Sequence, residues 1–113
     1  MSDHIKIRKL PGKYVIFGKG AVYGETDKAL ELTEGSRAPV IYIPRKDIAM
    51  AFFDKTDKTT TCPHKGAASY YSIDTKSTVL SNVAWSYETP HDTVAAIKDH
   101  LAFASGDVTV EAQ

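Results

Sequence analysis

The sequence has only one cysteine among its 113 residues, so the chain cannot form an internal disulfide. It also lacks any stretch near the roughly 20 apolar residues that a membrane-spanning helix needs, so no membrane contact is predicted. Residues 1–6 alternate between charged and apolar side chains and lack the apolar core of a secretory signal. A free thiol without an export signal is typical of a reducing compartment, and we expect the cytoplasm.

An excess of charge of one sign is also missing, because 14 basic residues balance 14 acidic residues. Proteins that bind nucleic acid usually carry a basic excess, so we expect no nucleic-acid partner.

Cys62 and His64 offer two metal ligands, but the other histidines have no matching spacing and no CxxC pair is present. Residues 18–20, Gly-Lys-Gly, lack the later glycine and the helix of a phosphate-binding loop. The sequence therefore predicts no metal and no cofactor.

What the sequence does contain is a series of short β-type segments separated by turn residues. Period-two alternation and β-branched runs predict strands at residues 5–10, 14–17, 21–23, 29–33, 39–43, 68–73, 78–87 and 108–110. Pro11-Gly12 has the composition of a tight turn and predicts that the first two strands pair with each other. Residues 44–47 suit a short helical turn, and residues 54–61 suit a loop or an edge strand.

One segment in the second half of the chain predicts a helix. Thr89 is placed as its N-cap and Pro90 at its first position, while Val94, Ile97 and Leu101 form one apolar stripe. Many short strands followed by a single late helix indicate a mainly β (α+β) domain with antiparallel sheets. The whole chain, residues 1–113, is expected to form this single domain.

Residues 59–66, Thr-Thr-Thr-Cys-Pro-His-Lys-Gly, form the most unusual stretch of the sequence. Cys62 stands close to His64 and Lys65, and a neighbouring cation raises the thiolate fraction that a nucleophilic or redox cysteine needs. The alternative is the commoner one, since a lone cysteine is most often a small buried apolar residue. Lys65, directly before Gly66, is suited to contact an anion, although a solvated surface lysine is the alternative.

Four aromatic residues lie on two adjacent predicted strands. Alternation places Tyr70 and Tyr71 on opposite faces, whereas Trp85 and Tyr87 share a face. Such residues dominate the cores of small domains, and they also form walls against flat or cationic ligands. Both interpretations stay open at this point.

Residues 60–71 (TTCPHKGAASYY) and 82–88 (NVAWSYE), followed by a segment that begins with proline, resemble the bacterial and fungal family catalogued as domain of unknown function 427. Residues 42–48 (YIPRKDI) are similar to that family's Tyr-Phe-Pro-x-x-Asp-Val segment. The resemblance runs from about residue 18 to residue 110 in an unbroken order of motifs.

The resemblance implies a fold similar to the β-tent or Mss4-like group, in which two antiparallel sheets lean together over a pocket. Cereblon's thalidomide-binding domain and methionine-R-sulfoxide reductases share that architecture, but their zinc-holding CxxC pairs are absent here. Some catalogues give the family a nucleotidyltransferase-like label, yet this chain has no Gly-Ser plus paired-aspartate signature. His64 stands where family members commonly have Trp or Tyr, which implies a flat side chain for packing or stacking. A shared fold does not by itself carry a function.

Three functions from different classes remain open. The favoured one is a module that binds an unidentified small molecule in an aromatic-walled pocket, with an anion as one option. The residues expected at this ligand site are Arg45, Cys62, His64, Lys65, Tyr70 and Trp85. The second is an enzyme that uses Cys62 as a nucleophile or redox thiol, and the third is a domain that forms a homo-oligomer through the apolar residues 49–53.

Overall fold

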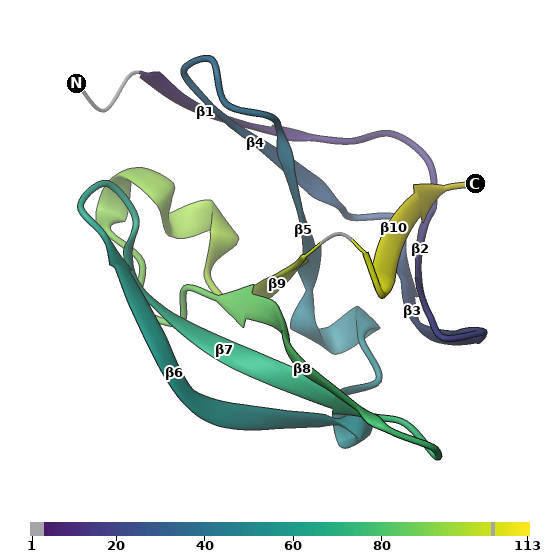
Figure 1. Ribbon diagram of the computed structural model, residues 1–113. Coiled ribbons are helices and arrows are strands. Elements are labelled where there is room, and N and C mark those ends of the chain that lie inside the picture. Colours follow the sequence, from purple (N-terminus) through teal and green to yellow (C-terminus); the bar gives the residue numbers. More distant parts are fainter. Residues whose placement is uncertain (1–3, 105) are drawn as a thin grey trace.

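In the computed structural model, which describes residues 4–104 and 106–113, the strands form two antiparallel sheets (Figure 1). The larger sheet has seven strands in the order β1 (Ile5–Lys9), β4 (Leu30–Glu34), β5 (Val40–Pro44), β9 (His100–Phe103), β8 (Val79–Ser86), β7 (Gly66–Asp74) and β6 (Phe53–Cys62). The smaller sheet has three, in the order β10 (Val108–Ala112), β2 (Tyr14–Gly18) and β3 (Ala21–Thr26). The predicted mainly β class with antiparallel sheets is confirmed.

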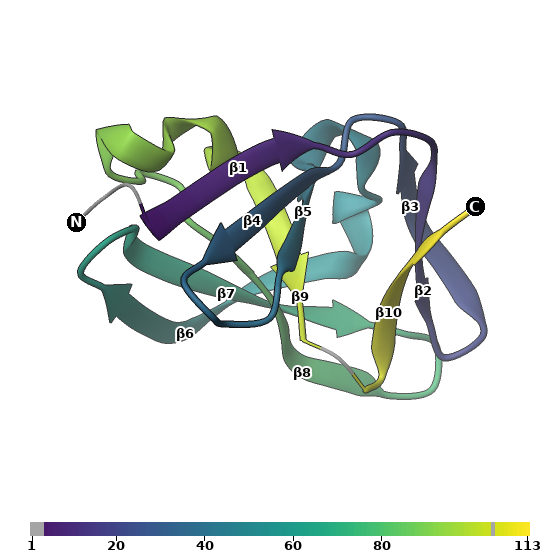
Figure 2. The same ribbon diagram turned by 90° about the horizontal axis from the view of Figure 1, so that it is seen from above.

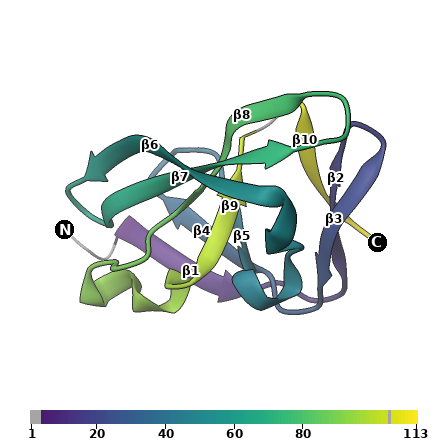
Figure 3. The ribbon, with the colours of Figure 1, turned by 90° about the horizontal axis from the view of Figure 1, so that it is seen from below.

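The larger sheet is bent, so that its two halves face each other. Strands β1, β4 and β5 form one half and β6, β7 and β8 form the other, while β9 pairs with both β5 and β8 at the bend (Figure 1). Figure 2, seen from above, shows the end of β4 and the turn after it lying over β7, with β1 alongside β4. Figure 3, from below, shows the smaller sheet at one end of the molecule, away from the β6–β7 turn. This bend positions the site described below.

Alternation along the central strands divides the buried side chains into two cores. Ile43 and Leu101 are fully buried on the face of the larger sheet that packs against Ile16 and Val108 of the smaller sheet. The adjacent residues point to the opposite face, between the two halves, because successive side chains of a strand alternate. The buried residues of this second core are Leu32, Tyr42, Ala68, Tyr87, Val94, Ile97 and Ala102.

The predicted helix is wrong, although its apolar residues are correctly placed in the core. Residues 92–97 form only a 3-10 segment, η4 (Asp92–Ile97), which buries Val94 and Ile97 and is interrupted by non-helical dihedral angles at Val94. Asp99 then takes a left-handed conformation, and Leu101 belongs to β9. Because β9 is hydrogen-bonded to strands on both sides, sheet pairing overrides the weak helical preference of this segment. Among the described residues, no helix has the length and apolar character needed to cross a membrane.

The predicted pairing of the first two strands is also wrong. β1 pairs with β4, with Ile7 opposite Leu32, whereas β2 pairs with β3 and β10 in the smaller sheet. The turn at Pro11-Gly12 exists, with Gly12 at a φ of 82°, but it takes the chain from one sheet to the other. A turn composition cannot distinguish a hairpin from such a corner, because both need the same local dihedral angles.

The remaining local predictions agree with the structure. Residues 54–61 lie in β6, an edge strand, and the helical turn expected at residues 44–47 is the 3-10 segment η2 (Arg45–Asp47). The apolar run 49–53 contains a second 3-10 segment, η3 (Met50–Phe52). Phe53 is buried in the core, whereas Phe52 is exposed, so the run does not form one continuous apolar surface.

The conformation of Asp99 gives a direct test of β9 against the predicted helix. Its φ of 59° is unfavourable for a β-branched residue, so Asp99→Val is expected to lower the free energy of unfolding by about 1–2 kcal/mol. Asp99→Gly should leave it unchanged or slightly higher, because glycine accepts positive φ. Lys98→Val is the matched control, since Lys98 has an extended backbone. Urea unfolding measures all three, and a helix would instead make Asp99→Gly the costly change, by about 1 kcal/mol.

Candidate ligand-binding site

A pocket of about 430 Å³ opens between the two halves of the larger sheet. Four of its lining residues are aromatic: Tyr42 on β5, Tyr70 on β7, Trp85 on β8, and Tyr87 just beyond β8. The other lining residues are Leu32, Glu34, Arg37, Ala38, Val40, Lys58, Lys65, Asn82 and Ala104. The aromatic cluster predicted from alternation is therefore present, and Tyr71 is buried in the other core.

The aromatic residues divide into buried ones and partly exposed ones. Tyr42 and Tyr87 are buried, and burial raises the pKa of both phenols, so they stay neutral at physiological pH. Tyr70 and Trp85 are half-buried and directly opposite each other on β7 and β8, with ring centroids 6.4 Å apart and planes tilted by 39°. The Tyr70–Trp85 pair therefore forms an accessible aromatic wall.

Lys65 is the unusual member of this pocket, because its side chain is buried. Its ammonium donates a hydrogen bond to Glu34 Oε1 over 2.7 Å and lies 5.9 Å from the centroid of the Tyr87 ring. The backbone fixes its position: Lys65 N–H donates to the Cys62 carbonyl, and the Lys65 carbonyl accepts from His91 N–H. The following Gly66 has a φ of 114°, a conformation that few other residues adopt, and this allows the turn.

The ion pair between Lys65 and Glu34 keeps both groups charged. The hydrogen bond from Lys65 lowers the pKa of Glu34 and outweighs the opposing effect of burial. For Lys65, burial favours the neutral amine, but hydrogen bonds with Glu34 and Cys62 outweigh it and raise its pKa. Lys58, whose ammonium lies 4.6 Å from the centroid of the Tyr70 ring, and the exposed Arg37 add two cations. Three cationic groups thus face a single carboxylate.

The residues predicted from the sequence fall into three places. Lys65, Tyr70 and Trp85 line the pocket together. Cys62 and His64 line a neighbouring cleft of about 520 Å³ instead. The thiol of Cys62 is half-buried.

Arg45 does not face the pocket, which corrects the prediction that it points into the same cleft as Trp85. Its guanidinium donates to the Tyr71 hydroxyl over 3.0 Å and to Glu88 Oε2 over 3.1 Å. Glu88 also accepts hydrogen bonds from Lys55 and Tyr71. The reason is alternation, because Tyr71 and Tyr70 are on opposite faces of β7 and Arg45 packs against Tyr71.

Several pocket residues were not identified from the sequence. Glu34 lies just after the predicted strand 29–33, and Tyr42 lies within the predicted strand 39–43. Glu34 and Lys65 are 31 residues apart, and only the strand order of the larger sheet brings them together. A buried acidic residue at a strand end carries no local signal that distinguishes it from a turn residue.

Fold and pocket together define a class: a mainly β domain with an aromatic-lined pocket that contains a buried lysine. The family model described as domain of unknown function (DUF427) matches residues 6–113, and the chain belongs to this family. The match confirms the resemblance and extends it to β1 and β2. None of the curated proteins matches the chain in sequence.

Breaking the buried ion pair should destabilise the fold. Lys65→Met leaves the buried Glu34 carboxylate with only its longer contacts to Arg37 and His4, so we expect a loss of about 3 kcal/mol in unfolding free energy. Adding Glu34→Gln removes the uncompensated charge and should recover part of the loss. Urea unfolding measures both, with Lys46→Met as the exposed control. A Lys65→Met variant as stable as the control would contradict a buried pair.

The Glu88 cluster predicts a dependence of stability on pH. Burial disfavours the charged carboxylate, but hydrogen bonds from Lys55 and Tyr71 outweigh it and hold the pKa of Glu88 below its usual value. A lowered carboxyl pKa stabilises the folded state above the unfolded pKa of about 4.3, and this is lost as pH falls through the folded pKa. Glu88→Gln should therefore lower stability at pH 7, and its difference from the parent should shrink below about pH 4.

Unfolding titrations at pH 7 and at acidic pH measure this difference. Glu25→Gln is the matched control, because Glu25 is exposed and its contact with Lys13 is long, at 3.8 Å. A Glu88→Gln effect that is equal at both pH values would show that the cluster does not depend on the charge of Glu88.

Proposed function

We propose that the protein binds a small, planar, anionic molecule in the aromatic pocket. The observation that carries this proposal is the buried Lys65 ammonium inside a pocket walled by Tyr70, Trp85 and Tyr87. A volume of about 430 Å³ is in the usual range for small-molecule sites. Aromatic walls with a few polar groups converging on them are the ordinary form of such a site.

The charges of the pocket favour an anion. Arg37, Lys58 and Lys65 outnumber Glu34, so the pocket has a positive excess. An ammonium has three donors, and Glu34 accepts from one of them, so a ligand can accept another without breaking the ion pair. A charge-assisted hydrogen bond in a partly dry pocket is stronger than the same bond in water. The preferred anion is a carboxylate or a phosphate.

The Tyr70–Trp85 pair favours a flat ligand. The two rings are partly exposed and adjacent, and a planar group stacks on such a surface with little loss of side-chain freedom. Cys62 does not line the pocket, so binding requires no covalent chemistry. The function proposed is therefore recognition of an aromatic carboxylate or a similar planar anion.

Trp85 is the only tryptophan, so its fluorescence reports directly on the pocket. We expect saturable quenching by one- and two-ring aromatic carboxylates or nucleoside monophosphates, and weaker binding of the corresponding neutral amides. Lys58→Gln and Arg37→Gln remove exposed cations and should each weaken anion binding by about fivefold, the effect of about 1 kcal/mol. Neither change should affect the melting temperature, because both side chains are exposed.

The matched control is Lys28→Gln, an exposed lysine outside the pocket. Binding in this variant should equal that of the parent chain. Equal affinity for the anionic and neutral compounds, or the absence of quenching across the whole series, would contradict the proposal.

A further inference from the structure

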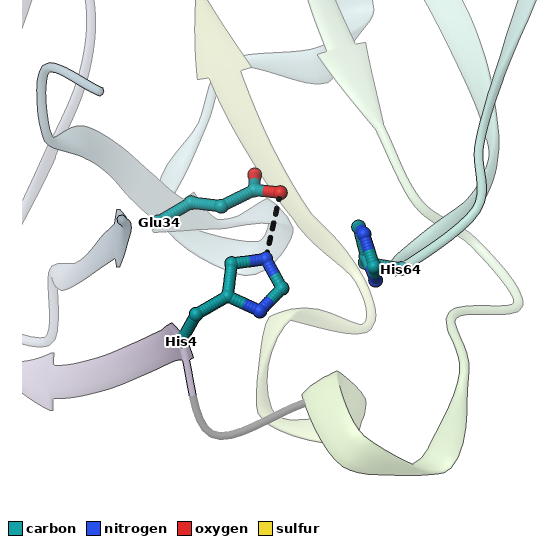
Figure 4. A group of neighbouring side chains, drawn as sticks. All are labelled: His4, Glu34 and His64. Atoms are coloured by element: carbon teal, nitrogen blue, oxygen red, sulfur yellow. Dashed lines mark hydrogen bonds and ion pairs between the residues drawn. The ribbon is translucent and has the colours of Figure 1, made fainter. Parts of the chain in front are cut away.

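A second group of chemically reactive side chains lies in the cleft beside the aromatic pocket. His4 precedes β1, Glu34 ends β4, and His64 lies in the turn between β6 and β7; Figure 4 shows the three converging. Each offers one ligand atom, and these atoms all lie within 4.8 Å of one another. His4 Nε2 is 3.4 Å from Glu34 Oε2, and the two imidazole rings meet edge to face with centroids 4.6 Å apart.

The distance of 3.4 Å between His4 Nε2 and Glu34 Oε2 matches that between two ligands of one metal ion, whereas the three ligand atoms together spread over up to 4.8 Å. Zinc is bound by imidazole nitrogen and carboxylate oxygen at about 2.0–2.2 Å, which places tetrahedral ligand atoms about 3.3 Å apart. His64 is exposed and the His4 side chain is 31% exposed, so small side-chain rotations can close the remaining gap. Glu34 is held more firmly, because its side chain is only 10% exposed.

The two oxygens of the Glu34 carboxylate have different surroundings. Oε1 accepts from Lys65 over 2.7 Å and lies 3.8 Å from Arg37, whereas Oε2 faces His4. A hydrogen bond to one oxygen of a ligating carboxylate orients the other toward the metal, as outer-shell partners do. The cations near Oε1 repel a metal ion bound at Oε2, and this repulsion lowers the affinity for the metal ion without changing the positions of its three ligands.

We propose that His4, Glu34 and His64 bind a divalent transition metal ion, of which zinc, nickel and cobalt are examples. Two imidazoles and one carboxylate suit these ions rather than magnesium or calcium, which prefer oxygen ligands. Three protein ligands leave positions for water, unlike the closed four-ligand sites that stabilise folds. The expectation of no metal rested on spacing in the sequence. In the structure, β1 pairs with β4 and places Ile5 opposite Glu34. This pairing brings His4 beside the Glu34 carboxylate, although the two residues are distant in the sequence.

The metal site is independent of the proposed ligand pocket. Neither His4 nor His64 lines the aromatic pocket, so substitutions at these histidines leave its walls unchanged. Glu34 lines both and is left unsubstituted, because removing it would leave Lys65 buried without its partner.

Isothermal titration of the chain without a histidine tag, using zinc chloride alone, tests the proposal. We expect one zinc ion per chain and a raised melting temperature in its presence. His4→Gln and His64→Tyr should each weaken binding by at least about tenfold, the loss typical even of an outer-shell partner. His91→Gln, an exposed histidine outside the cleft, should bind like the parent.

Titration with cobalt chloride identifies the ligand types through the absorption spectrum. Bands of nitrogen and oxygen ligation that persist in Cys62→Ser support the site, whereas loss of binding in Cys62→Ser alone would assign the metal to the thiol and overturn it. Zinc binding absent from the parent, or unchanged in both His4→Gln and His64→Tyr, would also overturn it. His64 is exposed, so His64→Tyr keeps the fold and remains decisive even if His4→Gln does not fold.

Discussion

The ion pair between Lys65 and Glu34 connects the two halves of the bent sheet. Glu34 ends β4 in one half, and Lys65 lies in the turn between β6 and β7 in the other. Both side chains are buried, so the pair has little competition from water and keeps the halves in one relative position. The depth of the aromatic pocket, the orientation of the Glu34 carboxylate and the neighbouring histidine cleft all depend on this contact.

Such a pair is better understood as a device for specificity than as a source of stability. Removing two charges from water costs as much free energy as their attraction returns, and an apolar pair of similar size often gives a more stable protein. An apolar pair, however, would offer no charge to a ligand and no carboxylate oxygen to the neighbouring histidine cleft. A polar contact at this place is consistent with the proposed function, since binding of an anion uses a buried cation.

Local sequence patterns predicted the elements of this fold better than their partners. Strand positions and the opposite faces of Tyr70 and Tyr71 follow from alternation, and the polar composition of residues 54–61 leaves an edge strand as one of two options. Alternation and composition are properties of each segment alone. The pairing of β1 with β4 and the insertion of β9 between β5 and β8 depend on contacts distant in sequence. Leu101 shows the limit of such local patterns. Its spacing from Ile97 fits a helix, but Leu101 lies in β9 and is buried there as a strand residue.

The residues of the candidate site also divide into those that local patterns could place and those that they could not. Lys65 and Trp85 could be placed together because the strand that follows Lys65 is joined by a short turn to the strand that carries Trp85. Arg45 could not, since its direction depends on which face of β7 it meets. Glu34 and His4 could not be recognised either, because the side chains that they meet, Lys65 and His64, are distant from them in the sequence.

The two outermost strands of the larger sheet bear on how the protein avoids aggregation. An exposed edge strand invites pairing with another chain, and charged residues, especially lysine, together with bulges, discourage it. Strand β1 carries Lys6, Arg8 and Lys9 at one edge. At the other edge, β6 carries Lys55 and Lys58, and its register shifts between Lys55 and Thr59. A second copy that added its own β1 at the β1 edge would have to bring like charges together, and at the other edge the register shift of β6 interrupts regular pairing, so the ends of the sheet are protected without being covered.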